Sequence, residues 1–188
     1  NPDNYVVVRS MKDIEANLRL SGDNNAALWI HSQAERDEME EVHAELNQID
    51  LGVISNAFSY IPPMKGILNA DFQYAPSDSA FMVVADMNID DLYYENERVG
   101  ELMFNAVYLP LEQGNHQVDM HLFRDRKEVS VITALYQMGE TDHISGNIEF
   151  MHFPLDIANP FIPDDMAKMG GDLDGTLAIS GQSDKPMA

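Results

Sequence analysis

Apolar and polar residues alternate with a period of two along much of the chain. Such alternation is typical of β-strands that have one dry face and one wet face. It is clearest in residues 14–20, 42–47, 118–122, 144–150 and 173–180. Four of these segments predict one shared apolar lining, whose residues are Val42, Ala44, Leu46, Val118, Met120, Leu122, Ile144, Ile148, Leu173, Leu177 and Ile179.

Three other segments are apolar at successive positions, namely residues 80–85, 102–109 and 129–136. A strand of this kind has no wet face of its own. We therefore expect these segments at the centre of a sheet, or where another element covers the second face.

Short turn signals separate the strands at fairly even intervals, in residues 22–25, 75–78, 112–115, 124–127 and 139–142. Turns at such short intervals predict a meander, in which each strand pairs with the next. Taken alone, the pattern fits an antiparallel sandwich or barrel.

Helical signal is confined to two places. The first is residues 50–60, where Asp50 is expected to cap a short helix. The second is residues 164–169, just after Pro163. Residues 35–41 are acidic and fit either a helical turn or a loop.

Composition limits the functions that the fold can serve. The 188 residues are 45% hydrophobic and carry 32 acidic against 11 basic side chains, for a net charge of −21. That excess repels phosphate backbones, so nucleic-acid binding is disfavoured, whereas burial of acyl chains is unaffected by distant charge. There is no cysteine, which excludes disulfides and thiolate metal sites.

No apolar run approaches the ~18 residues needed to span a bilayer. The chain begins at Asn1-Pro2 and stops at Pro186-Met187-Ala188. These ends predict a single β-rich domain over residues 1–188 that is a fragment of a larger protein.

Two internal echoes suggest repeated units. The shorter is an apolar residue followed by Ser-Gly, at residues 20–22, 144–146 and 179–181. The longer relates residues 49–74 to residues 153–181, each with an apolar start, a short helix or coil, Pro, Met and Lys, Gly, and then a strand. Such repeats predict a β architecture in which each unit needs a neighbour to cover it.

The second repeat carries a family resemblance. Its run Gly171-Asp172-Leu173-Asp174-Gly175-Thr176-Leu177-Ala178-Ile179-Ser180-Gly181, followed by Pro186, resembles the C-terminal conserved region of the TamB and AsmA-like family of bridge-like envelope proteins. The pattern is moderately specific, and strongly similar residues cover about a third of the chain. Residues 49–72 match more loosely, because the second and third glycines are absent.

The resemblance implies a periplasmic protein anchored to the inner membrane by an N-terminal helix outside this sequence. It implies a β-taco, a curled sheet with an open apolar groove. It also implies roles in outer-membrane protein assembly beside a barrel partner, and in moving phospholipids between membranes. The family has no catalytic residues, so the resemblance implies none here.

The sequence offers little evidence for a metal site or a catalytic site. Asp86, Asn88, Asp90 and Glu97 fall at positions 1, 3, 5 and 12 of an EF-hand-like loop, but Asp91 stands where the motif needs Gly. We expect an acidic loop between two strands rather than a calcium site. No HExxH, nucleophile elbow, P-loop or dinucleotide fingerprint occurs, so neither an enzyme nor a cofactor is expected.

Two functional hypotheses remain. In the first, the apolar lining forms a groove for acyl chains or for unfolded outer-membrane protein clients. In the second, the chain is a closed β-sandwich adhesin or glycan-binding module, with Trp29, Tyr93 and Tyr94 stacking on sugars. The inner face discriminates between them, because a sandwich fills it with side chains from a second sheet.

Overall fold

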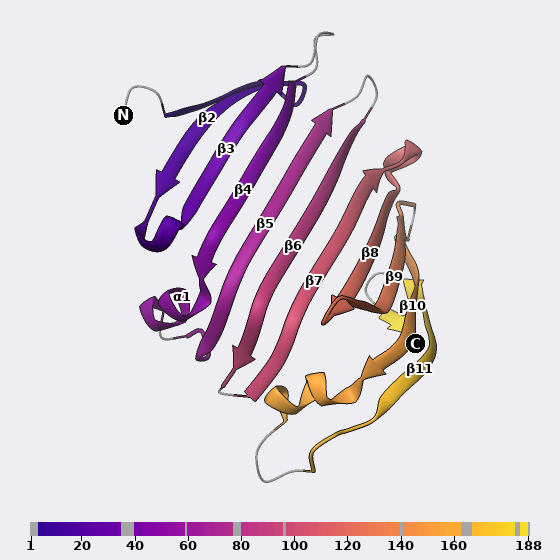
Figure 1. The fold of residues 1–188 in the computed structure, drawn as a ribbon. Coiled ribbons are helices and arrows are strands. Elements are labelled where there is room, and N and C mark those ends of the chain that lie inside the picture. The colour runs from indigo at the N-terminus through magenta and orange to yellow at the C-terminus, as the bar shows by residue number, and fades with distance from the viewer. Residues whose placement is uncertain are drawn as a thin grey trace.

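The computed structural model describes residues 4–34, 40–58, 60–76, 80–95, 97–139, 141–162, 167–182 and 185–187. Its strands form one sheet of twelve strands in chain order, each antiparallel to the next (Figure 1). The two outermost strands, β1 and β12, are not hydrogen-bonded to each other in the described part of the chain. The predicted all-β meander with an open, curled sheet is therefore confirmed.

The strands are long through the middle of the sheet and shorter at its margins. Their bounds are β1 (Tyr5–Ser10), β2 (Asp13–Ser21), β3 (Ala27–Ala34), β4 (Glu40–Asp50), β5 (Met64–Pro76), β6 (Phe81–Tyr94), β7 (Glu97–Pro110), β8 (His116–Arg124), β9 (Lys127–Gln137), β10 (His143–Pro154), β11 (Asp172–Gln182) and β12 (Lys185–Met187). One α-helix, α1 (Leu51–Ala57), and the 3-10 helices η1 (Asp23–Asn25), η2 (Glu112–Gly114) and η3 (Leu155–Phe161) complete the described elements.

The first predicted helix is confirmed as α1. Its N-cap is Asp50, whose carboxylate accepts hydrogen bonds from the backbone N–H groups of Gly52, at 2.7 Å, and Val53, at 3.4 Å. These bonds satisfy two of the donors that a helix start leaves unpaired. Leu51 and Ser55 are the buried residues of α1, and the Ser55 hydroxyl bonds to the backbone of Met64 at the start of β5.

The second predicted helix is not seen where it was placed. Residues 163–166 lie outside the described part of the chain, and residues 167–169 are not helical. The helical segment of this region is η3, which comes directly after β10. Most of the acidic segment 35–41 also lies outside the described residues.

The two longer sequence echoes have the same order of elements. Residues 49–74 contain the end of β4, α1 and β5, and residues 153–181 contain the end of β10, η3 and β11. Because β4 and β10 run in the same direction through the meander, α1 and η3 lie at the same ends of the strands (Figure 1). We call this side of the sheet the helix end.

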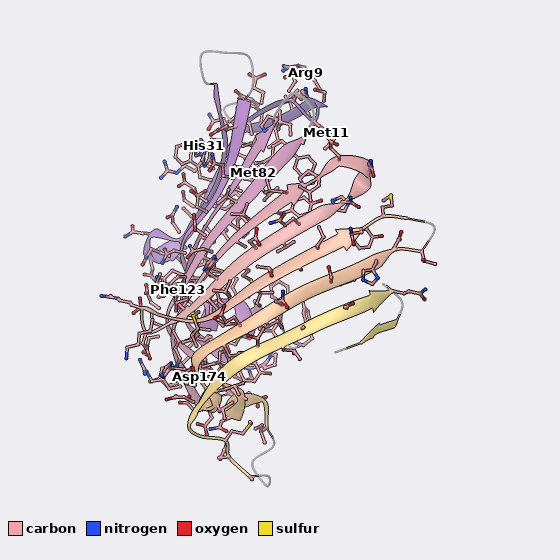
Figure 2. The ribbon with its side chains drawn as sticks, turned by 90° about the vertical axis from the view of Figure 1, so that its right-hand side faces the viewer. Arg9, Met11, His31, Met82, Phe123 and Asp174 are labelled. Carbon is pink, nitrogen blue, oxygen red and sulfur yellow. The ribbon has the colours of Figure 1, made fainter. Side chains whose placement is uncertain are left out.

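The sheet curls, and its first hairpin turns over one face. The hydroxyl of Tyr74 in β5 donates to the backbone carbonyl of Met11, in the turn between β1 and β2, at 2.8 Å. Two strands, β3 and β4, lie between the first hairpin and β5 in the sheet, so this hairpin must fold back over the face that carries Tyr74. We call this concave face the inner face. Figure 2 shows the outer-face residues His31, Phe123 and Asp174 toward one edge of the view and Met11 on the opposite side.

Cross-strand pairing keeps each face distinct from β2 to β11. The central inner-face row contains Leu18, Ile30, Ala44, Phe72, Ala85, Ala106, Met120, Ile132, Ile148 and Leu177. The adjacent outer-face row contains Asn17, His31, His43, Gln73, Val84, Val107, Asp119, Thr133, Asn147 and Ala178. The first row is wholly apolar, and the second is mostly polar.

Very little of this protein is buried. The buried hydrophobic residues of the described chain are Ala16, Leu51, Ala70, Val99, Leu102 and Val129. No described side chain is fully enclosed. Inner-face residues such as Leu20, Phe72 and Leu177 keep 53%, 39% and 40% of their surface exposed, because no second layer of described residues covers them.

Gly146 allows β9 and β10 to approach closely on the inner face. It pairs with Ala134 in β9 and with Ile179 in β11. A Cβ atom added at this position would lie 2.7 Å from the backbone carbonyl oxygen of Thr133. The two Ile-Ser-Gly echoes at residues 144–146 and 179–181 face each other in this same register.

We therefore predict that Gly146→Ala lowers the free energy of unfolding by about 1–3 kcal/mol, because the crowded atom belongs to the backbone and cannot rotate away. Urea denaturation measures this change. Gly170→Ala is the matched control, since nothing lies within 4 Å of a Cβ atom there. Equal stability of the two variants would show that the close approach is absent.

Candidate functional site

All eleven residues of the predicted lining lie on the inner face. Val42, Ala44 and Leu46 of β4 pair with Tyr74, Phe72 and Ala70 of β5. The predicted residues of β8 and β10 are joined on the inner face by residues of β9, which pairs with both strands. The predicted residues of β11 extend the surface beyond β10. The register thus joins four segments, far apart in sequence, into one apolar surface.

The strands between these segments were predicted at residues 80–85, 102–109 and 129–136, but their inner-face residues were not assigned. Phe72, Met87, Phe104 and Ile132 fill the inner face between the predicted residues. In β6 the outer face is also apolar, with Met82 and Val84 beside Val83 and Ala85. Alternation cannot be read from such a strand, so pairing with its neighbours is needed to assign its faces.

The inner face is uncharged over its middle. The two inner-face rows beside the central row also contain no charged residue. One row consists of Leu28, Leu46, Ala70, Met87, Phe104, Leu122, Ser130, Phe150 and Gly175. The other consists of Val42, Tyr74, Val83, Tyr108, Val118, Ala134, Gly146 and Ile179. Carboxylates such as Glu45, Asp71 and Asp86 lie in one outer-face row instead. The net charge of −21 is therefore kept off the apolar surface.

Five rings line the inner face at the strand ends opposite α1 and η3. This aromatic row consists of Tyr74, Phe81, Tyr108, His116 and Tyr136, from β5 to β9. Successive ring centroids are 5.2, 5.8, 5.7 and 5.7 Å apart. These separations, with interplanar angles from 15° to 41°, are those of offset pairs.

The polar atoms of the aromatic row are paired locally. The Tyr108 hydroxyl lies 2.8 Å from Nδ1 of His116, and the Tyr136 hydroxyl donates to Asp142 at 2.5 Å. The bond to Asp142 raises the pKa of Tyr136 and lowers that of Asp142. Burial raises the pKa of Tyr74. The row therefore presents aromatic rings with polar atoms along one rim of the apolar surface.

A buried cation marks the helix end. Arg124, the last residue of β8, has a side chain that is only 11% exposed. Its two terminal nitrogens donate to the carboxylate oxygens of Asp156 in η3, at 2.5 and 3.1 Å. This bidentate pair fastens η3 to the sheet, and the hydrogen bond lowers the pKa of Asp156.

The acidic segment 86–97 does not form the expected loop. Residues 86–94 belong to β6, and the turn begins only at Glu95. Asp86 and Asn88 lie on the outer face, where Asp86 accepts a hydrogen bond from Asn105. Within the described residues, no cluster of three or more His, Asp or Glu side chains could hold a metal ion.

The aromatic residues proposed for sugar stacking are not brought together. Trp29 lies on the outer face of β3, stacked on His31 at 3.9 Å between ring centroids. Tyr93 and Tyr94 lie at the helix end of β6. In addition, all the described strands belong to a single sheet, whereas a closed sandwich needs two.

Comparisons with protein-family models, curated proteins and solved structures gave no match to this chain. The resemblance to the TamB and AsmA-like family therefore stays a prediction from the sequence. Among the described residues, no helix has both the length and the apolar character needed to cross a membrane.

We predict that Asp156→Asn destabilises the protein at pH 7, by about 1–3 kcal/mol, because it weakens the pair with the nearly buried Arg124. The folded pKa of Asp156 is below its unfolded value of ~3.9, so the contribution is complete above that value and is lost as the pH falls through the folded pKa. The stability difference from wild type should thus shrink below about pH 4.

Urea denaturation of both proteins at pH 7 and pH 3 measures this difference. Asp172→Asn is the control, because this exposed residue begins β11 at the same end of the sheet. A destabilisation of Asp156→Asn that stays constant with pH would contradict a role for the carboxylate charge.

Proposed function

We propose that this chain is a segment of a non-enzymatic periplasmic scaffold, and that its inner face receives phospholipid acyl chains in transit between membranes. The observation that carries the proposal is the apolar inner face, which runs without a charged side chain from β4 to β11 in its three middle rows. Its side chains stay partly exposed, although the chain is long enough to bury a much larger core.

Exposed apolar surface of this extent is costly in water. Soluble monomers seldom expose contiguous apolar patches beyond a few hundred Å² unless something binds there. An acyl chain laid on the inner face would gain roughly 25 cal/mol for each Å² of apolar surface removed from water. Because this gain is non-directional, it favours a sliding, unspecific ligand over one held in a fixed pose.

The cellular setting of the proposal comes from the family resemblance. The resemblance implies a periplasmic location, in a longer protein with an inner-membrane anchor and a barrel partner in the outer membrane. An unfolded outer-membrane protein would bind the same apolar surface. Assembly of such client proteins is therefore a variant of this proposal, and the crosslinking experiment below distinguishes it from lipid transport. The high negative charge supports the absence of nucleic acid among the partners.

Site-specific photo-crosslinking in bacteria tests the proposal. With the photoreactive residue at Met120 or Val42 on the inner face, we predict phospholipid adducts, detectable by mass spectrometry of the purified protein. Asp119 is the matched control, because it adjoins Met120 in β8 but lies on the outer face. Adducts with outer-membrane proteins would favour the client variant, and crosslinks only within the chain would contradict both.

A charge on the inner face should abolish binding. We predict that Met120→Lys lowers the affinity of the purified chain for a fluorescent fatty acid by an order of magnitude or more, because the ammonium would have to be desolvated beside the ligand. Thr133→Lys is the control, since Thr133 is exposed on the outer face of the neighbouring strand. Equal binding by the two variants would place the ligand elsewhere.

A further inference from the structure

The aromatic row gives the inner face two unlike rims. At the helix end, Arg124 is occupied by Asp156. At the other end, five half-buried rings stand side by side over five strands. Offset pairing leaves part of each ring face uncovered by its neighbour.

Tyrosine rings at such a rim suit the boundary between acyl chains and headgroups. Their apolar bodies continue the apolar surface formed by Val83, Val118 and Ala134 in the next positions along the strands. The hydroxyls of Tyr74 and Tyr136 donate to polar groups of the turns beyond the strand ends, the Met11 carbonyl and the Asp142 carboxylate. Aromatic belts of membrane proteins likewise combine an apolar ring with a polar tip. A lipid with its acyl chains on the inner face would therefore place its headgroup beside this row.

The charge around the row favours a cationic group. No Lys or Arg occurs in residues 66–97, 99–123 or 128–167, which cover β6, β10 and almost all of β5, β7, β8 and β9. Asp142 stands at the Tyr136 end of the row, and Glu112 lies in the η2 turn between Tyr108 and His116. The basic residue of the adjoining β1–β2 turn, Lys12, is at the opposite end, beside Met11 and Tyr74.

We infer that the aromatic row selects phospholipids with an ammonium headgroup, such as phosphatidylethanolamine, over anionic phospholipids. An ammonium is attracted to the faces of Tyr108 and Tyr136 by cation–π interaction and to Asp142 by charge. An anionic headgroup such as glycerol phosphate meets the same carboxylate, whereas the Lys and Arg residues of β5 to β9 lie at the helix end, away from the row. This inference rests on the proposed function, since it names the substrate class of the same surface.

The test is a competition between headgroups. The purified chain is incubated with vesicles of equimolar phosphatidylethanolamine and phosphatidylglycerol that have identical acyl chains, and protein-bound lipid is isolated and quantified by mass spectrometry. We expect wild type to bind phosphatidylethanolamine with roughly threefold preference, as one or two exposed cation–π contacts would give.

Three variants locate the preference. Tyr108→Leu combined with Tyr136→Leu, and separately Asp142→Asn, should bring the ratio close to one. Glu149→Gln removes a carboxylate from the outer face of β10 and should behave as wild type. The Asp142 variant keeps every ring in place, so it reports on charge even if the double variant is poorly folded.

The outcomes separate the two proposals. Bound lipid with no headgroup preference, or with a preference for phosphatidylglycerol, would overturn the inference and leave the proposed function standing. A preference that survives in both the Asp142 variant and the double variant would also overturn it. No bound lipid in wild type would overturn the proposed function, and the inference with it.

Discussion

Cross-strand register that stays continuous through the middle rows is the constraint on which the whole structure depends. Side chains alternate between faces, so a slip of one residue in any strand would move its apolar side chains to the outer face. The breaks in register fit this constraint. Between β4 and β11 they fall at the helix end, beyond Leu46, Ile89, Leu122 and Phe150. The middle rows are left continuous, and the irregularity gathers where α1 and η3 join the sheet.

A single curled layer changes what holds the protein together. Most domains of this length enclose a core between two layers, whereas the six buried hydrophobic residues of the described chain are distributed over α1, β2, β5, β7 and β9. The sheet is instead held by the backbone ladders between successive strands and by contacts along each face. Individual side-chain interactions stabilise it further, such as the Tyr74–Met11 hydrogen bond and the Arg124–Asp156 ion pair. The inner face contributes to stability while remaining open to a ligand.

The sequence predicted the meander, the helix capped by Asp50, and the inner-face positions of β4, β8, β10 and β11, because their outer faces are polar enough to expose the alternation. It did not predict β3, where Trp29 interrupts the pattern between Leu28 and Ile30. The aromatic row could not be predicted from the sequence either. Its five residues share no sequence spacing, and only the turn lengths and register of five strands bring them into one line.

Pairing of every strand with its successor also gives the chain a low contact order. Each hairpin can form from residues that are near one another in sequence, so folding is expected to grow strand by strand from the long central hairpins of β5, β6 and β7. The same linear arrangement makes unfolding graded, as in repeat proteins, with amide protection highest in the middle of the sheet and falling toward β1 and β12. Unfolding is thus expected to begin at the two outermost strands and to proceed toward the centre of the sheet.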